Sequence, residues 1–287
     1  MIMQKILKRT AGATAAIALA VTIGTSVASA EPSAELVTFG DSFTANPDTV
    51  LNALNNSGLP IPELEGTVPV ETTDGCAQAM NNWPRQLGEQ QGLSVADYSC
   101  TAGTSTGAVQ KLQTAIADGK VGPGTKHIVA MIGGNDFGGF GALDTMTPPT
   151  KENVNAQFMD NMDAFVAEAR RVAPDVQITL AGYPEVLDQN RLCLIQLDGN
   201  APVGFEVPGN LGVQYQDWMA EQMGWAADKH DLVFVDNYNM TRGHSTCAPA
   251  EQRYVTGIID NETDWNMQLH PTAEGSRVVA ENVGATF

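Results

Sequence analysis

Positively charged residues are scarce in this sequence. Lysines and arginines number 15 against 33 aspartates and glutamates, which gives a formal net charge of −18 at pH 7. So acidic a surface repels the phosphates of nucleic acids and of anionic membranes. The shortage of positive charge therefore excludes nucleic acids from the expected partners and favours a neutral substrate.

Long apolar runs are missing after residue 30, which excludes a membrane-spanning helix from that part of the sequence. Before it, two lysines and an arginine are followed by the apolar run "AGATAAIALAVTIG" and by Ala-Ser-Ala. This order is typical of a secretory signal peptide. A membrane anchor is the alternative, but the run is short for a span and rich in alanine and threonine. We expect residues 1–30 to be cleaved and residues 31–287 to be secreted, without stable membrane insertion.

Cysteines are few, and none is spaced for metal binding. The four in the sequence form no C-x-x-C pair, so we expect no zinc site, and the scattered acidic residues define no calcium loop. An even number of cysteines in an exported chain indicates disulfides instead. Three pairings are possible. We favour sequential neighbours, because each bond would then close one long irregular segment: Cys76–Cys100 and Cys193–Cys247.

Internal repeats and low-complexity linkers are absent as well, so residues 31–287 are expected to form a single domain. Strand-like segments such as "ELVTFG", "KHIVAMIGGND" and "LVFVDN" alternate with helical ones, of which "NVNAQFMDNMDAFVAEARRVAP" is the clearest. Such alternation predicts an α/β fold whose parallel strands are joined by helical crossovers. Three long insertions interrupt the pattern, at about 45–80, 187–212 and 239–263, and the cysteines suggest that they are stapled.

Ligands bind at the carboxyl ends of parallel strands, and a serine stands at one of them. In "VTFGDSFTAN" the first strand breaks just before Ser42. A serine hydroxyl becomes a good nucleophile only when a neighbouring base takes its proton. His270 in "QLHPTAEG" is the best candidate, because it lies on a loop before the final helix, and His244 is a weaker alternative. His127 and His230 precede or begin strands, at the opposite edge of the sheet.

A carbonyl attacked by serine develops negative charge, which requires hydrogen-bond donors placed in advance. "IGGND" ends the third strand with Asn135, whose side-chain NH2 group can donate. "SCTAGTSTG" ends the second strand with Ala102 and Gly103, and the backbone N–H of Ser42 is a further donor. Separate strand ends thus deliver a nucleophile, an amide, a glycine and a histidine, which predicts a hydrolytic site.

Three motifs together resemble a known family. "GDSF" near the start of the expected mature chain, "GGND" in its middle and "LHP" near its end resemble the SGNH, or GDSL-type, hydrolases in order and spacing. The resemblance spans nearly all of residues 31–287. It implies a flavodoxin-like three-layer α/β/α sandwich with a central parallel sheet of about five strands, and ester hydrolysis through an acyl-serine intermediate without a cofactor. "YSCTAG", "AGYP" and the cysteine placement resemble the secreted, disulfide-bonded esterases and lipases of actinobacterial type.

The resemblance also implies roles for individual residues. Ser42 and His270 would be catalytic, and Ser42, Gly103 and Asn135 would form the oxyanion hole. Because the residues before Gly103 depart from the subgroup's usual Ser-Gly, Ala102 is an alternative source of the backbone N–H.

One departure from the family concerns the group that orients the histidine. Many members carry an aspartate three residues before it, where this chain has Met267. The ring of His270 needs another acceptor to fix its tautomer, and we consider the backbone carbonyl of Met267 or the carboxylate of Asp264. Asp41 and Asp136 are expected to tie loops together by accepting backbone N–H bonds.

The sequence therefore predicts a secreted serine esterase or lipase, a monomer that acts on a small-molecule or lipid ester. A non-catalytic glycan- or lipid-binding module on the same scaffold is one alternative, motivated by the missing aspartate. An acyltransferase that passes the acyl group to a sugar instead of water is another. The presence of Ser42, Asn135 and His270 together favours catalysis, because binding alone requires none of that set.

Overall fold

The computed structural model describes residues 33–48, 69–138 and 150–287. Residues 31–287 form one compact unit, distinct from residues 1–30, and the expected signal peptide lies outside the described residues. Within the described ranges, no helix is long and apolar enough to cross a bilayer. The same ranges contain no group of three or more histidine, cysteine, aspartate or glutamate residues that could hold a metal ion.

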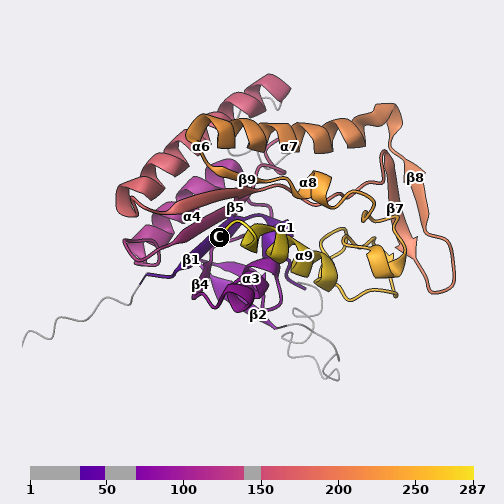
Figure 1. The fold of residues 1–287 in the computed structure, drawn as a ribbon. Helices are drawn as coiled ribbons and strands as arrows, with labels where there is room; N and C mark the ends of the chain where they lie inside the picture. Colours follow the sequence, from indigo (N-terminus) through magenta and orange to yellow (C-terminus); the bar gives the residue numbers. More distant parts are fainter. Residues whose placement is uncertain (1–32, 49–68, 139–149) are drawn as a thin grey trace, which may run out of the picture. The chain divides into compact units, whose positions relative to one another are not determined.

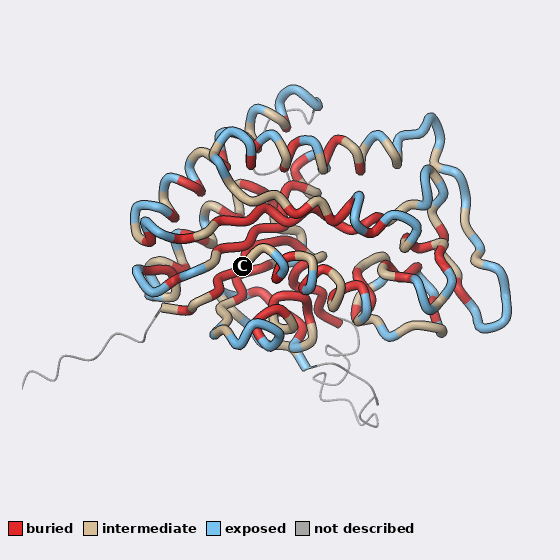
Figure 2. Tube along the Cα trace, in the orientation of Figure 1, coloured by how far each residue is buried: buried red, intermediate tan, exposed pale blue. Residues whose placement is uncertain are grey.

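Five parallel strands form the central sheet (Figure 1). Numbered by their order in the chain they read 2-1-3-4-5, which is the flavodoxin order. The middle strands are buried on both faces and almost entirely apolar, as parallel strands between two helical layers must be (Figure 2). In spatial order the strands are β4 (Val95–Asp97), β1 (Leu36–Gly40), β5 (His127–Met131), β6 (Gln177–Ala181) and β9 (Val233–Val235).

Helices cover both faces of this sheet (Figure 1). On one face α3 (Trp83–Gln91) packs against α9 (Ala273–Gly284). On the other face α6 (Lys151–Val172) packs against both α4 (Ser105–Ala117) and α7 (Leu211–His230). This arrangement confirms the predicted three-layer sandwich with a central parallel sheet of five strands.

The longest helix, α6, shows how the sequence builds one of these layers. Thr150 caps its first turn by accepting the Asn153 N–H, and two arginines lie in its last turn, where they complement the helix dipole. Phe165 projects edge-on against Phe39 of β1, with ring centroids 5.2 Å apart. The apolar face expected from the helical spacing is buried against the sheet in full: Phe158, Met162, Phe165, Val166 and Ala169.

The three insertions take different forms. The first follows α1 (Ser42–Ala45), and its described part contains an antiparallel hairpin of β2 (Val70–Thr73) and β3 (Cys76–Ala79); its residues 49–68 lie outside the described ranges. The second and third are less irregular than expected, because they share a three-stranded sheet. That sheet consists of β7 (Arg191–Gln196), β8 (Val203–Glu206) and β10 (Ile259–Asp260), and shorter helices flank it: η1 (Pro208–Asn210), α8 (Asn237–Met240) and η2 (Ala250–Gln252).

Both disulfides join the cysteines that are sequential neighbours, as expected. Cys76–Cys100 links the β2–β3 hairpin to the segment that follows β4, and Cys193–Cys247 links β7 to the segment that follows α8. The first bond therefore ties the first insertion to the carboxyl end of β4, and the second ties the second and third insertions to each other.

Candidate active site

The candidate nucleophile lies in a helical turn at the carboxyl end of β1. Asp41 caps this turn, because its Oδ1 accepts the Phe43 N–H at 2.9 Å, and Ser42 becomes the first residue of α1. A Cβ on Gly40 would lie 2.9 Å from the carbonyl oxygen of Met131, so only glycine allows the turn to pack this closely against β5. Ser42 is thereby held at the edge of the sheet.

Ser42 and His270 are brought into hydrogen-bond contact. His270 Nε2 lies 2.7 Å from Ser42 Oγ, although 228 positions separate the two residues. A second contact ties the same segments together: Asn46, which ends α1 in a left-handed conformation, donates from Nδ2 to the carbonyl of Pro271 at 2.9 Å. The nucleophile turn and the histidine loop are therefore held by two hydrogen bonds rather than one.

The other ring nitrogen of His270 has an acceptor that the sequence did not identify. His270 Nδ1 lies 2.7 Å from the backbone oxygen of Gln268, which corrects the expectation of the Met267 carbonyl or the Asp264 carboxylate. The physical reason is a left-handed φ of 61° at Leu269, which folds the ring back onto the carbonyl two residues earlier. Asp264 is exposed to solvent. The acceptor is thus a backbone carbonyl, as one of the two expectations supposed, but it belongs to a different residue.

The surroundings of His270 favour the neutral ring. Burial lowers the pKa of the imidazole below its usual value of 6.5, and the hydrogen bond to Gln268 opposes this effect. The Phe43 ring lies against it, with centroids 4.6 Å apart. At neutral pH the ring can therefore donate from Nδ1 to Gln268 and accept from Ser42 at Nε2.

The residues expected to bind an oxyanion lie together beside Ser42. Asn135 follows β5, and its Nδ2 donates to the carbonyl of Gly103 at 3.0 Å and to Asp41 Oδ2 at 3.4 Å. A Cβ on Gly103 would lie 3.0 Å from the carbonyl oxygen of Gly40, so the turn after β4 packs closely on the nucleophile turn. The ends of β1, β4 and β5 thus converge at one place.

The two candidate backbone donors in the turn after β4 differ in their hydrogen bonds. The Gly103 N–H donates to the carbonyl of Cys100 at 2.8 Å and closes a turn in which Ala102 adopts a φ of 64°. Within the described part of the chain, the Ala102 N–H has no hydrogen-bond acceptor. The geometry therefore favours Ala102, the alternative, over Gly103 as the donor from this turn.

Asp41 and Asp136 tie loops together, as expected. Asp41 accepts the N–H of Phe43, and Asp136 Oδ1 accepts the Ser105 N–H at 2.8 Å at the start of α4. Both carboxylates are buried, so these backbone donors stabilise the turns that surround the site.

A buried tyrosine that the sequence did not assign to the site lies beneath it. Tyr183 follows β6 in "AGYP", and its Oη donates to Asp41 Oδ2 at 2.6 Å and accepts the Gly134 N–H at 3.0 Å. Tyr215 of α7 donates to the Gly134 carbonyl. The signal that could have found Tyr183 is its position at a strand end on the same edge as Ser42 and Asn135.

The remaining histidines lie away from Ser42, and each has another partner. His244, the weaker candidate for the base, donates from Nδ1 to the Gln252 carbonyl at 2.7 Å and stacks on Tyr254. His127 stacks on Phe287, and His230 Nε2 lies 2.8 Å from an Asp163 oxygen. Of the four histidines, His270 is the one that contacts the serine.

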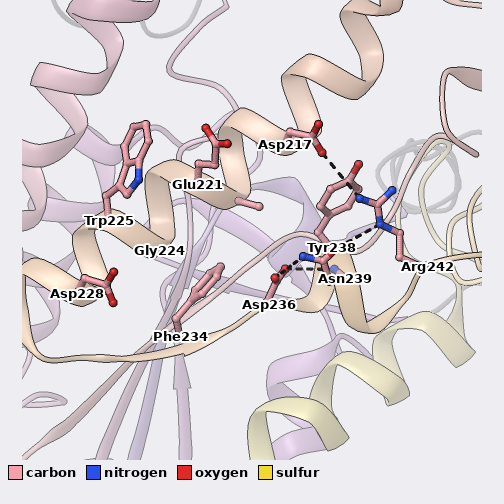
Figure 3. Close-up of a pocket in the computed structure, with 11 residues that line it drawn as sticks. Asp217, Glu221, Gly224, Trp225, Asp228, Phe234, Asp236, Tyr238, Asn239 and Arg242 are labelled. Atoms are coloured by element: carbon pink, nitrogen blue, oxygen red, sulfur yellow. Dashed lines mark hydrogen bonds and ion pairs between the residues drawn. The ribbon is translucent and has the colours of Figure 1, made fainter.

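A hollow of about 370 Å³ lies away from this site, between α7 and the segment from β9 to α8 (Figure 3). Trp225, Phe234 and several carboxylates line it, and none of the lining residues belongs to the site described above. Arg242 lies 4.0 Å from the centre of the Tyr238 ring and within 3.8 Å of a carboxylate from α7. The cation and one of the acids are therefore already paired, and the hollow lacks a nucleophile with an adjacent base.

Comparisons with known proteins identify a family and a shared fold. The model of the GDSL-like lipase/acylhydrolase family matches residues 38–278. The extracellular lipase from Streptomyces rimosus superposes with a TM-score of 0.57 at 17% identity, over 88% of this chain and 99% of that one. The phospholipase A1 from Streptomyces albidoflavus NA297 gives a TM-score of 0.54 at 17% identity, over 88% and 98%. No curated protein sequence matches significantly.

At 17% identity, the two solved structures show a shared fold. The family match is stronger evidence, because it covers most of the chain and includes the strand ends that bear Ser42 and Asn135 and the loop that bears His270. It confirms the resemblance inferred from "GDSF", "GGND" and "LHP". The protein belongs to the GDSL-like lipase/acylhydrolase family.

Proposed function

We propose that the protein is a secreted carboxylic ester hydrolase that acts through an acyl intermediate on Ser42. Its family supports a hydrolase of ester substrates. The observation that carries the proposed mechanism is the 2.7 Å contact between Ser42 Oγ and His270 Nε2. Secretion is supported by the N-terminal sequence pattern and by two disulfides, which form in oxidising compartments.

In the first half-reaction, neutral His270 takes the proton of Ser42 as Oγ attacks the ester carbonyl carbon. The tetrahedral intermediate collapses, the C–O bond to the alcohol breaks, and the imidazolium returns its proton to the departing alcohol. A water molecule then attacks the acyl-serine with His270 again as base, which releases the free acid and regenerates the serine.

The negative charge of both tetrahedral intermediates would be stabilised by three donors. These are the backbone N–H groups of Ser42 and Ala102 and the side-chain amide of Asn135. The Ser42 N–H lies in the first turn of α1 and so has no acceptor within that helix. Asn135 can donate to the oxyanion by giving up its 3.4 Å bond to Asp41 while it keeps the 3.0 Å bond to Gly103.

The acceptor for His270 Nδ1 sets the expected strength of the base. The Gln268 carbonyl fixes the tautomer and orientation of the ring, but it is neutral. It therefore stabilises the imidazolium less than a carboxylate would. We expect a working Ser-His dyad of moderate rate rather than a charge-assisted triad.

The proposal is tested with Ser42→Ala and with Ser94→Ala, an exposed serine that serves as the matched control. Ser42→Ala is expected to lower kcat/KM for a short activated ester by about 10³-fold or more and to abolish labelling by a fluorophosphonate, while its circular dichroism stays unchanged. Ser94→Ala should keep both properties. Undiminished turnover by Ser42→Ala would exclude this serine as the nucleophile.

The substrate is tested by esters of graded acyl length on glycerol, phospholipid and sugar alcohols. The names of the two neighbours, a lipase and a phospholipase A1, motivate the first two series. The acidic surface favours esters without a net negative charge. Release of free acid in the presence of excess sugar alcohol would support hydrolysis over acyl transfer.

A further inference from the structure

We infer that Tyr183 is a positioning residue for the oxyanion donor Asn135, and that it acts through the Asp41 carboxylate and the Gly134 backbone. The inference rests on the proposed function, because it assigns Asn135 a role in the same hydrolytic site. Tyr183 does not contact the reacting pair itself. Its effect on the reaction is exerted through two neighbours of Asn135.

The Tyr183 hydroxyl donates to one neighbour of Asn135 and accepts from another. It donates to Asp41 Oδ2 at 2.6 Å, the same oxygen that Asn135 Nδ2 approaches at 3.4 Å. It also accepts the N–H of Gly134, the residue immediately before Asn135, at 3.0 Å. One hydroxyl therefore orders both the carboxylate that the amide faces and the peptide from which the amide extends.

Packing leaves the tyrosine no alternative position. Its side chain is 6% exposed and meets Phe43 edge-on, with ring centroids 5.4 Å apart. A Cβ on Gly134 would lie 3.1 Å from Tyr183 Oη and 3.4 Å from Asp41 Oδ2. The tyrosine and the carboxylate therefore pack closely on the "GGND" turn, where glycine at residue 134 leaves room for both side chains.

The charge on Asp41 is sensitive to this tyrosine. Burial, with a smaller effect from Asp136, raises the pKa of Asp41, and the hydrogen bond from Tyr183 is the largest effect that lowers it; together these effects place the pKa at about 7. Tyr215 also faces the pair from α7, and His270 lies beyond the Phe43 ring. The ionised carboxylate can accept from Phe43, Tyr183 and Asn135 together, whereas the protonated form gives up one of these acceptor sites.

Removal of the tyrosine hydroxyl is the direct test. Tyr183→Phe is expected to lower kcat about 10- to 100-fold with KM changed less than about threefold, because an oxyanion exists only in the transition state and the intermediates. The acidic limb of kcat/KM is expected to move to higher pH, because Asp41 loses the donor that favours its ionised form.

Tyr98→Phe is the matched control, since it also deletes a buried tyrosine hydroxyl that donates to a carboxylate, that of Asp118, at 2.7 Å. It should leave kcat and the pH profile unchanged. Asp41→Asn is the second variant. Asparagine keeps an acceptor oxygen but does not titrate. The acidic limb of kcat/KM near pH 7 should therefore disappear, which leaves the limb that His270 causes below pH 6.5.

The outcomes separate this inference from the proposed function. Suppose that the wild type hydrolyses esters and is labelled on Ser42, but Tyr183→Phe has the same kcat and pH profile as Tyr98→Phe. That result would overturn the inference and leave the proposed function intact. Wild type without turnover or labelling would overturn both. If Tyr183→Phe fails to fold, Asp41→Asn decides: a limb retained at about pH 7 contradicts the inference, and its loss supports it.

Discussion

At the scale of single residues, the backbone conformation of Leu269 influences how the histidine is held. Its left-handed backbone is a conformation that costs a non-glycine residue about 1 kcal/mol. Two backbone hydrogen bonds to the third insertion hold this loop in place: Leu269 N–H to the Gly257 carbonyl at 3.0 Å, and Thr256 N–H to the His270 carbonyl at 3.1 Å. The insertion therefore maintains the conformation that directs His270 Nδ1 to a carbonyl.

This geometry predicts that Asp264 is dispensable for catalysis. Asp264→Asn is expected to change kcat/KM for a short ester by less than about twofold, whereas loss of a true third triad member costs on the order of 10⁴ in kcat. Steady-state kinetics at pH 8 provide the measurement, with Ser42→Ala as the inactive reference. A loss of 100-fold or more in a folded Asp264→Asn protein would restore the carboxylate as the histidine's partner.

At the scale of elements, the third insertion is organised around one buried cation. The Arg253 guanidinium is 1% exposed and forms ion pairs with Asp260 at 2.9 Å and Glu262 at 2.8 Å. The Arg253 carbonyl accepts the hydroxyl of Thr272, the residue that caps α9. Since His270 lies two residues before Thr272, the buried network around Arg253 also holds the histidine loop in place.

The two disulfides have separable effects at this scale. In the chain-entropy model, their sequence separations of 24 and 54 residues correspond to about 3.5 and about 4 kcal/mol of unfolding free energy. We expect the Cys193→Ala/Cys247→Ala variant to lose slightly more stability in urea unfolding. The Cys76→Ala/Cys100→Ala variant should lose more activity, because the disulfide anchors residue 100, where the turn that contains Ala102 begins and whose carbonyl accepts the Gly103 N–H. Equal activity in the two variants would contradict the assignment of that turn to the oxyanion site.

At the scale of the whole molecule, the net negative charge determines how stability depends on salt and pH. The sequence has 33 acidic and 15 basic residues. Like charges destabilise the compact state through repulsion. The described ion pairs that lie on the surface offset little of this, since exposed pairs contribute about 0–1 kcal/mol each.

Added salt is therefore expected to stabilise the protein at pH 8. Raising NaCl from 0.1 to 1 M shortens the Debye length from about 10 to about 3 Å, and we expect Tm to rise by about 2–4 °C. The control is the same titration at pH 4.4, near the isoelectric point, where the rise should vanish or reverse. A fall in Tm at pH 8 would mean that attractive pairs outweigh the repulsion.

The fold and three of the site residues follow from the sequence by itself. Buried parallel strands are continuous apolar runs, which can be recognised in the amino-acid sequence. The helical spacing of Phe158, Met162 and Phe165 can be recognised there as well. Parallel strands place their carboxyl ends on one edge, which assigns Ser42 and Asn135 to one site, and the loop before the final helix supplies His270 as the candidate base.

Tertiary structure alone decided the partners of those residues. Whether the carbonyl of Gln268 or that of Met267 accepts from His270 Nδ1 depends on the φ angle of Leu269. A leucine at this position does not predict a left-handed backbone. Tyr183 reaches Asp41 across 142 positions, because β1 and β6 end on the same edge of the sheet. Local propensity and periodicity act over a few residues, whereas these contacts depend on ångström-scale packing between segments that are distant in the chain.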